Sequence, residues 1–176
     1  PTLDRPFYGN YGSRYWAGLP TVGPPPAPRP GTAAIYDPVG DRMLVFGGLT
    51  FTGYSRGDLW QLSLSGTPTW SELHPASGPS ARENHTAIYD AAKRRMIVFG
   101  GTDSLSGASD NDVWALNLPA LTWTHLLPTG TPPPGRHEHT AVYDSRRERM
   151  LVTGGQVDSG DPRDVWALDL APATPV

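Results

Sequence analysis

The sequence predicts an all-β fold in which a unit of four short strands is repeated three times. One observation is a recurring segment, Arg-Met followed by an apolar run and Gly-Gly, at residues 42–48, 95–101 and 149–155. A second is a tyrosine that precedes each copy at near-constant spacing, at Tyr36, Tyr89 and Tyr143. The third is composition: 20 Gly and 20 Pro accompany six Trp and seven Tyr, which is typical of many short strands joined by tight turns. A segment repeated at a fixed period is an architectural unit.

The elements of one unit can be assigned in chain order. The first strand is Thr-Ala-(Ile/Val)-Tyr, as at 86–89, and a polar turn such as 37–41 connects it to the second. The second strand is a continuous apolar run, the pattern of a strand covered on both faces. The third alternates, as at 60–64, and the fourth is short, around Trp70. Four antiparallel strands in a unit of about 50 residues make a propeller blade.

The glycine pair ends the second strand in every copy. Inner strands of a propeller converge on an axis, where side chains lack room and the backbone must bend into a loop. Glycine supplies the unusual φ values and allows another backbone or a ring to approach closely. We therefore expect an architectural role for the pair.

These units resemble kelch repeats. The resemblance is carried by the Gly-Gly pair, the preceding tyrosine and a following tryptophan, at Trp60, Trp114 and Trp166, and it covers residues 30–170. It implies a kelch-type β-propeller, usually of six or seven blades. It also implies that the face formed by the loops between strands 2 and 3 and between strands 4 and 1 binds the ligand or partner.

The repeats divide the chain into four parts. Residues 1–29 form an N-terminal segment with the outer strand of a preceding blade, around Trp16. Kelch repeat 1 spans 30–82, repeat 2 spans 83–136, and repeat 3 spans 137–176 and lacks its fourth strand. Three four-stranded blade equivalents make half of a six-bladed ring or a fragment of a longer propeller.

An open set of blades leaves unpaired strand edges. We expect ring closure either by a second copy, whose strand around Trp16 completes the last blade, or by the remainder of a longer chain. The chain begins with Pro1 and not with Met, which favours processing or a longer parent protein.

Composition narrows the partners. The formal net charge of −3 predicts no general attraction to nucleic acid, and the sequence has no apolar run of the length that spans a bilayer. The absence of cysteine excludes thiolate metal sites and cysteine nucleophiles, and with them the Cys–Tyr cofactor of kelch copper-radical oxidases. The compartment stays open, a secreted or cell-surface location being one candidate.

The loops between strands 2 and 3 vary among the repeats while the framework does not, as expected of recognition loops on a rigid scaffold. The candidate ligand-binding residues on these loops and at the ends of the 4–1 connections are Arg29, Arg82, Arg136, His137, Phe51, Tyr54, Arg56, Asp103, Asp110, Gln156, Asp158 and Arg163.

Arg29, Arg82 and Arg136 occupy one position of the repeat, and two roles fit them. A ring of arginines could clamp a carboxylate at the channel mouth. Alternatively, each arginine bonds loop carbonyls of the neighbouring blade, which recurrence in every repeat favours.

His137 and His139 lie on one face of an extended strand, which invites a metal interpretation. Such a site needs a third ligand and supporting partners. We expect these side chains to bond backbone at the start of the blade, and we predict no metal and no cofactor.

The sequence thus predicts a non-catalytic scaffold that presents variable loops to a protein or carbohydrate partner. One alternative is a propeller enzyme, sugar-modifying or lyase-type, with its site at the channel mouth. Another is a structural assembly component. Fold alone does not decide among them.

Overall fold

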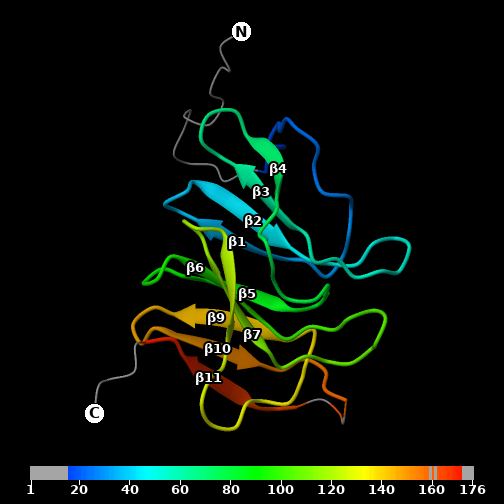
Figure 1. The fold of residues 1–176 in the computed structure, drawn as a ribbon, viewed down its shortest axis with the longest axis vertical. Helices are drawn as coiled ribbons and strands as arrows, with labels where there is room; N and C mark the ends of the chain where they lie inside the picture. The colour runs from blue at the N-terminus through cyan, green and yellow to red at the C-terminus, as the bar shows by residue number, and fades with distance from the viewer. Residues whose placement is uncertain (1–15, 159, 161, 172–176) are drawn as a thin grey trace.

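The computed structural model describes residues 16–158, 160 and 162–171. The strands of the described residues form three antiparallel sheets that follow one another along the chain (Figure 1). The first sheet contains β1 (Ala33–Asp37), β2 (Arg42–Phe46), β3 (Leu59–Ser63) and β4 (Thr69–Leu73). The second contains β5 (Thr86–Asp90), β6 (Arg95–Phe99), β7 (Val113–Asn117) and β8 (Thr122–Leu126), and the third β9 (Thr140–Asp144), β10 (Arg149–Thr153) and β11 (Val165–Asp169).

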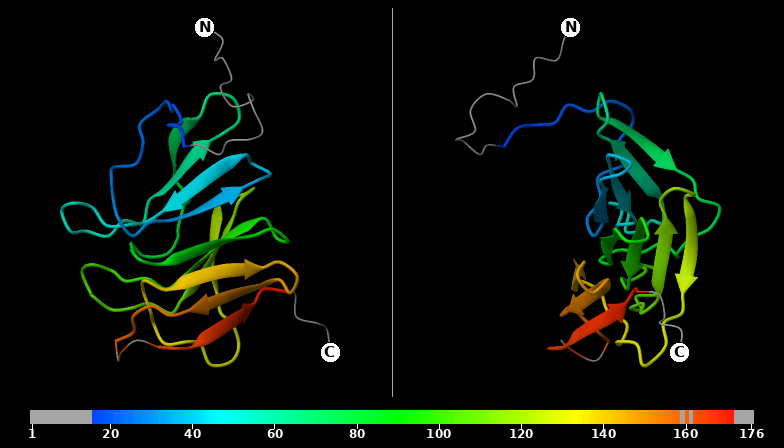
Figure 2. Two further views of the ribbon diagram at one scale, coloured as in Figure 1. Left: turned by 180° about the vertical axis from the view of Figure 1, so that it is seen from behind. Right: turned by 90° about the vertical axis from the view of Figure 1, so that its left-hand side faces the viewer.

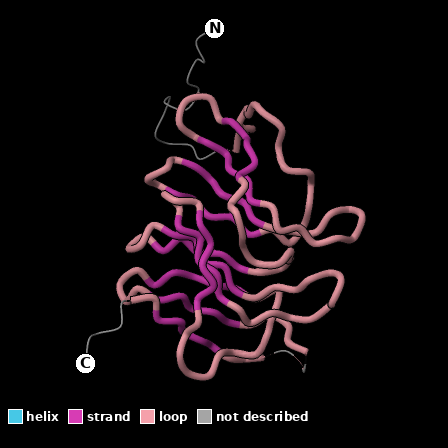
Figure 3. The backbone as a smooth tube through the Cα atoms, viewed as in Figure 1, coloured by secondary structure: helices cyan, strands magenta, loops and turns pink. Residues whose placement is uncertain are grey.

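Each sheet is a simple meander in which strands adjacent in sequence are paired. The register repeats as well, since Tyr36 pairs with Met43, Tyr89 with Met96 and Tyr143 with Met150. The predicted all-β fold is confirmed. The described residues contain no helix (Figure 3). They therefore include no helix that is long and apolar enough to cross a membrane.

The sheets are arranged as wedges. The first strands of consecutive sheets lie against one another, β1 against β5 and β5 against β9, whereas β4 and β8 share no comparable contact within the described residues. Sheets that converge at their first strands and diverge at their last have the geometry of propeller blades (Figure 2).

Two apolar clusters fill the spaces between sheets. Ile35, Leu44, Phe46 and Leu59 of the first sheet pack against the second, around Met96. A second cluster joins the other face of the middle sheet to the third, around Met150. The core is therefore a pair of layers between blades.

The prediction that the second strand is buried on both faces holds only for the middle blade. In β6 every residue after Arg95 is buried, whereas β2 and β10 alternate. The reason is position: within the described chain only the middle sheet has a neighbour on each face, so the end faces of sheets one and three meet none.

The N-terminal segment lies beside the first blade, and its assignment to the outer strand of a preceding blade stays a prediction. Trp16 lies in no strand and is fully exposed, while Val22 forms a parallel bridge with Thr69 of β4. The segment then continues to Arg29, which bonds Asp58. Residues 1–15, which include most of the N-terminal segment predicted to precede that blade, lie outside the described residues.

Candidate binding face

The connections between strands 2 and 3 and those between strands 4 and 1 lie on one face, here called the loop face (Figures 1 and 3). It comprises residues 47–58, 100–112 and the described residues of the third loop (154–158, 160 and 162–164), together with 74–85 and 127–139. Backbone hydrogen bonds join the two kinds of connection: Gly48 donates to the Arg82 carbonyl, and Gly101 to that of Arg136. The turns between strands 1 and 2 lie at the opposite edge of the sheets.

The glycine pair makes these backbone hydrogen bonds possible. Gly100 and Gly101 have φ of 64° and 99°, in the left-handed region. A Cβ on Gly100 would lie 2.6 Å from the Arg136 carbonyl oxygen and 2.9 Å from His139 Cε1. Both the conformation and the close approach therefore require glycine.

Each recurring arginine is tied to the sheet that follows it. Arg82 donates to both carboxylate oxygens of Asp112, at 2.6 and 3.0 Å, and to the Gly100 carbonyl at 3.0 Å. Arg136 repeats the arrangement with Asp164, at 2.7 and 2.8 Å, and with the Gly154 carbonyl. Bidentate pairing of this kind fixes both distance and orientation.

The same carboxylates accept a third hydrogen bond. The indole Nε1 of Trp114 donates to Asp112 at 2.7 Å, and that of Trp166 to Asp164 at 2.6 Å. In the first repeat Arg29 and Trp60 both bond Asp58. The arrangement of Arg, Asp and Trp, here called the crossing lock, thus occurs three times.

The locks shift the titration of their carboxylates. Hydrogen bonds from Arg136 hold the pKa of Asp164 well below its usual range, against the opposing effect of burial. Burial alone would raise the pKa of Asp112, but bonds from Arg82 and Trp114 outweigh it and the pKa is lowered. Both carboxylates are therefore ionised at neutral pH.

The ligand-clamp prediction for Arg82 and Arg136 is revised by this geometry. Their side chains are 1% and 0% exposed and point into the protein. Arg29 is 7% exposed and paired with Asp58. The contacts correspond to the other interpretation, in which each arginine bonds the loop of the neighbouring blade. The predictive signal for the partner was present, since an aspartate stands two residues before each of these tryptophans.

Two of the variable loops are fastened to each other. The Ser55 amide donates to Ser104 Oγ at 2.8 Å, and the Ser104 amide donates to Ser55 Oγ at 2.9 Å. This reciprocal pair joins the 47–58 loop to the 100–112 loop, 49 residues away in sequence. The loops of the first two blades therefore form one surface.

Large apolar side chains are exposed on these two loops. Phe51 is 85% exposed, Tyr54 58% and Leu105 78%. Arg56 is exposed beside them, and its backbone bonds both Gly48 and Arg82. The prediction placed Phe51, Tyr54 and Arg56 on the loops, and in the structure all three are exposed on the 47–58 loop.

Acidic groups lie between the first two blades. Glu83 bridges to Thr102, which brings it beside the loop that carries Asp103 and Asp110. Burial raises the pKa of Glu83, and it raises the pKa of Asp110 despite the charge of Arg82, 3.4 Å away. Sequence reasoning missed Glu83, because its position is taken by Pro30 in the first repeat and His137 in the third.

The remaining predicted residues lie toward the third blade. His137 Nδ1 is 3.0 Å from Ser109 Oγ, and its backbone bridges to Gln156. The Gln156 side-chain amide donates to Glu138. Asp158 and Arg163 are exposed on the 154–164 loop. The candidate residues over the first two blades thus include both apolar and charged side chains, whereas those toward the third blade are polar.

Two histidines are buried at the start of the inner strands. Burial, reinforced by the charge of Arg82, lowers the pKa of His85 to about 3, and burial with Arg136 lowers that of His139 to about 4. His139 Nε2 meets Thr86 Oγ1 at 2.7 Å, whereas neither ring nitrogen of His85 has a partner in the described structure. The difference follows from Ala33, which stands in the first repeat where the second has Thr86. Among the described residues, no three His, Asp or Glu side chains are grouped to hold a metal.

Comparison with known proteins matches residues 2–174 to the KLHDC2/KLHL20/DRC7 Kelch-repeats domain. Host cell factor homolog hcf-1 of Caenorhabditis elegans is 34% identical over 149 residues, which cover 75% of this chain and 18% of that protein. Host cell factor 1 of Homo sapiens is 32% identical over 161 residues, 82% of this chain and 8% of that protein. The chain thus spans less than a fifth of the length of these relatives.

Among solved structures, the chain is similar to YjhT, with a TM-score of 0.56 and 24% identity. The match covers 74% of this chain and 35% of that one. At this identity the similarity concerns the fold.

Proposed function

The chain belongs to the kelch-repeat family, and from that premise we propose that it is a non-catalytic binding module whose loop face takes a protein partner. The observation that carries the proposal is the exposure of the apolar side chains Phe51, Tyr54 and Leu105 on two loops that are fastened to each other. Exposed apolar clusters of this kind mark interaction sites, and aromatic side chains dominate the energetics of interfaces.

The support comes from preorganisation as well as exposure. Loops that are already fixed lose little conformational entropy on binding, so more of the contact energy appears as affinity. The Ser55–Ser104 pair fixes two loops to each other, and the crossing locks fix the connections to the sheets that follow them. Phe51 and Tyr54 would form the apolar centre of the contact.

Polar groups surround this centre and would form the rim. Asp103, Asp110 and His137 lie between the blades, and the exposed side chains of Asp158 and Arg163 extend the face over the third blade. Rim charges tune the rate and the specificity of association more than its strength. A partner with mixed charges fits this rim better than a strongly acidic or basic one.

The test uses peptides selected by display on the wild-type chain, measured against Phe51→Ala/Tyr54→Ala. Val39→Ala is the matched control, because Val39 is 61% exposed but lies on a turn between strands 1 and 2, at the opposite edge. We expect the double variant to bind the selected peptides at least about thirtyfold more weakly, since a hot spot contributes 2 kcal/mol or more. Equal loss in the Val39 variant, or no loss in the double variant, would contradict the proposal.

A carbohydrate partner is the second outcome of the same experiment. Aromatic rings with one exposed face also accept the apolar face of a sugar, so a glycan array should be read with the same variants. Glycan binding that depends on Phe51 and Tyr54, without peptide binding, would replace the protein partner by a carbohydrate at the same face.

The module would be completed by further blades. The end face of the first sheet exposes Tyr36, and that of the third exposes Val142 and Val165. The equivalent faces of the middle sheet are covered. Closure by a second copy to give a homodimer, or by the remainder of a longer chain, would cover them.

A further inference from the structure

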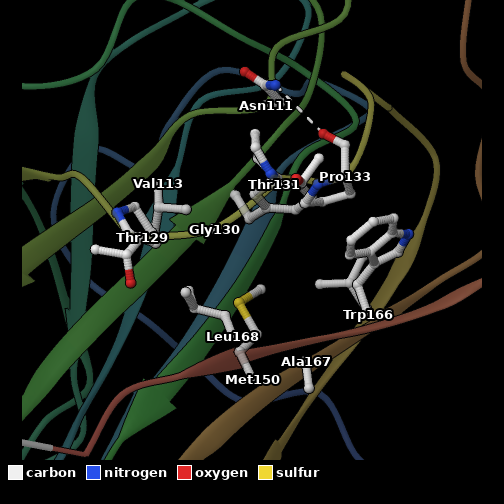
Figure 4. Close-up of a pocket in the computed structure, with 14 residues that line it drawn as sticks. Asn111, Val113, Thr129, Gly130, Thr131, Pro133, Met150, Trp166, Ala167 and Leu168 are labelled. Carbon is white, nitrogen blue, oxygen red and sulfur yellow. Dashed lines mark hydrogen bonds between the residues drawn. The ribbon is translucent and has the colours of Figure 1, made fainter. Parts of the chain in front are cut away.

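A polar hollow lies between the first two sheets, at the edge opposite the loop face. Its volume is about 410 Å³, which is within the range of pockets that take a small ligand or a side chain. The cavity between the middle and third sheets has another character, because apolar side chains such as Met150, Trp166 and Leu168 form its walls (Figure 4). Of these two spaces, only the polar hollow has charged walls.

Two blades contribute the walls of the polar hollow. The residues that matter for its chemistry are Asp37, Arg42 and Gln61 of the first blade and Arg94, Pro119 and Leu121 of the second. The first three belong to β1, β2 and β3, and the others to the turns between β5 and β6 and between β7 and β8. Described sheets therefore bound the hollow on both sides.

Arg42 is held in the hollow at three of its nitrogens. Its Nε donates to Asp37 at 3.1 Å, its Nη1 to the side-chain oxygen of Gln61 at 3.0 Å, and its Nη2 to the Leu118 carbonyl of the second blade at 3.0 Å. Three of the five N–H groups of the guanidinium are thus used, which leaves two for a ligand. The side chain is 17% exposed, so these two donors are fixed in place and still within reach of solvent.

Gln61 makes this guanidinium different from its counterparts. Arg95 and Arg149 occupy the equivalent position of the other repeats, but alanine replaces the glutamine in both. The Gln61 side-chain amide donates to Ser71 Oγ at 3.0 Å, which leaves its carbonyl oxygen to face Arg42. The first blade therefore orients its arginine by a contact that the sequence does not repeat.

Arg94 supplies a positive charge that the hollow does not neutralise. It is exposed, and within the described residues its side chain makes no hydrogen bond or ion pair. The cations on either side of it are already used, since Lys93 donates to the Leu170 carbonyl and Arg95 pairs with Asp90. Arg94 is therefore free to contact a ligand.

The position of Arg94 is acidic in the other two repeats. The backbone is the same at all three, with φ of 45° at Asp41, 49° at Arg94 and 47° at Glu148. A cation at this position is thus specific to the junction of the first two blades, while the turn itself accepts a carboxylate.

The charges of the hollow sum to one uncompensated cation. Asp37 is the only carboxylate among its described walls. Burial alone would raise the pKa of Asp37, but hydrogen bonds from the Gly40 amide and from Arg42 outweigh it and the pKa is lowered. Asp37 is therefore ionised at neutral pH and balances Arg42, so the charge of Arg94 is left over.

We propose that this hollow binds the carboxylate of an acidic side chain on a protein partner, between Arg94 and the two free donors of Arg42. One uncompensated cation matches the single charge of a carboxylate, whereas a phosphate dianion would also be repelled by Asp37. Pro119 and Leu121 offer an apolar wall to the stem of the side chain. The assignment to a protein rests on the binding-module function proposed above, but the preference for a carboxylate rests on the hollow alone.

The first experiment observes the two arginines directly. Each arginine Nε–H gives its own NMR signal, so the signals of Arg42 and Arg94 report whether the hollow is occupied. The probe is the blocked peptide acetyl-Leu-Glu-Leu-amide, and its control is the same peptide with glutamine in the centre. We expect both signals to shift to saturation with the glutamate peptide, and the glutamine peptide to bind at least about tenfold more weakly, because it lacks the charge that strengthens these hydrogen bonds.

The second experiment repeats the titration with variants. Arg94→Glu introduces the residue type that the third repeat has at this position, and it should abolish the shift of the Arg42 signal. Arg146→Glu is the matched control, because it makes the same change of charge at an exposed turn residue outside the hollow, and it should bind like the wild type. Melting curves show whether each variant is folded. Arg94→Gln, which removes the charge with little change of shape, gives the same comparison if Arg94→Glu does not fold.

The outcomes separate the parts of the proposal. Equal binding of the two peptides, or equal losses in Arg94→Glu and Arg146→Glu, would overturn it. Tighter binding of inorganic phosphate than of the glutamate peptide would overturn the choice of a carboxylate, and acetate binding as tightly as the peptide would overturn the protein side chain as its source. Phe51→Ala/Tyr54→Ala should leave this titration unchanged, so failure of the loop-face proposal is distinguishable from failure of this one.

Discussion

Replacing Arg82 by alanine removes a guanidinium that is 1% exposed and donates to Asp112, Gly100 and Ser80. Breaking a buried ion pair by truncating one partner typically destabilises a protein by about 3–5 kcal/mol. Asp112 is 26% exposed and keeps its bond from Trp114, so water and the indole relieve part of the loss. We therefore expect about 3 kcal/mol, at the lower end of that range.

The expected decrease is a large fraction of the stability of a single domain, which is about 5–15 kcal/mol. For a chain of this size it corresponds to a melting temperature lower by about 6–12 °C. Urea unfolding followed by tryptophan fluorescence and by circular dichroism measures it, with the agreement of the two probes testing two-state behaviour.

A series of arginines provides the controls. Arg136→Ala should resemble Arg82→Ala, because the Asp164 lock has the same bidentate geometry. Arg29→Ala should be milder, since Arg29 makes one bond to Asp58 and its side chain is less completely buried. Arg56→Ala, on an exposed loop, should lie within about 0.5 kcal/mol of the wild type.

The reasoning fails if Arg82→Ala melts within 2 °C of the wild type while ligand binding is lost. That result would favour a ligand-binding role for Arg82, and it would show that other contacts hold the first two blades together. A double-mutant cycle with Asp112→Asn separates the two, because a structural lock requires strong coupling between these residues.

The other predictions concern the glycine pair and the buried histidines. Gly100→Ala should destabilise the chain by clearly more than Gly154→Ala. Both glycines have a left-handed φ, but of the two only Gly100 faces a carbonyl oxygen, and equal melting temperatures would remove the steric argument. Burial lowers the pKa of His85 to about 3, so the folded chain holds this side chain neutral. Its contribution to stability is therefore full above pH 6.5 and declines as the pH falls toward 3. The unfolding free energy should depend less steeply on pH in His85→Thr, and an identical slope would contradict this. Ala33→Thr should give His85 the hydroxyl partner that His139 has, and so stabilise the chain by about 1 kcal/mol at pH 7. An unchanged free energy of unfolding in urea would show that the His85 ring already has another hydrogen-bond partner.

Most of the fold could be predicted from the periodicity of the sequence. The strand segments predicted around Tyr89, Met96 and Trp114 are β5, β6 and β7, and the same holds in the other repeats. Periodicity could not show which faces are covered. The strands β2 and β6 differ in sequence at one residue, Leu44 against Ile97, yet β2 has one neighbouring sheet and β6 has two. Burial here depends on position in the stack.

The candidate site could be predicted from the sequence only in part. Loop variation located Phe51 and Tyr54, but the Ser55–Ser104 pair that fixes them depends on two loops of unequal length meeting in space, for which the sequence has no local signal. The partner of Arg82 did have a signal, since an aspartate recurs two residues before each tryptophan, although it lies 30 residues away in this repeat and 28 in the next.

Recurrence and variation therefore have opposite meanings in this chain. A residue that returns in every repeat, such as Arg82, meets another recurring residue, and its interactions are complete inside the protein. Phe51, which does not return, is left to solvent, whereas Ser55 and Ser104 find each other only because two variable loops meet.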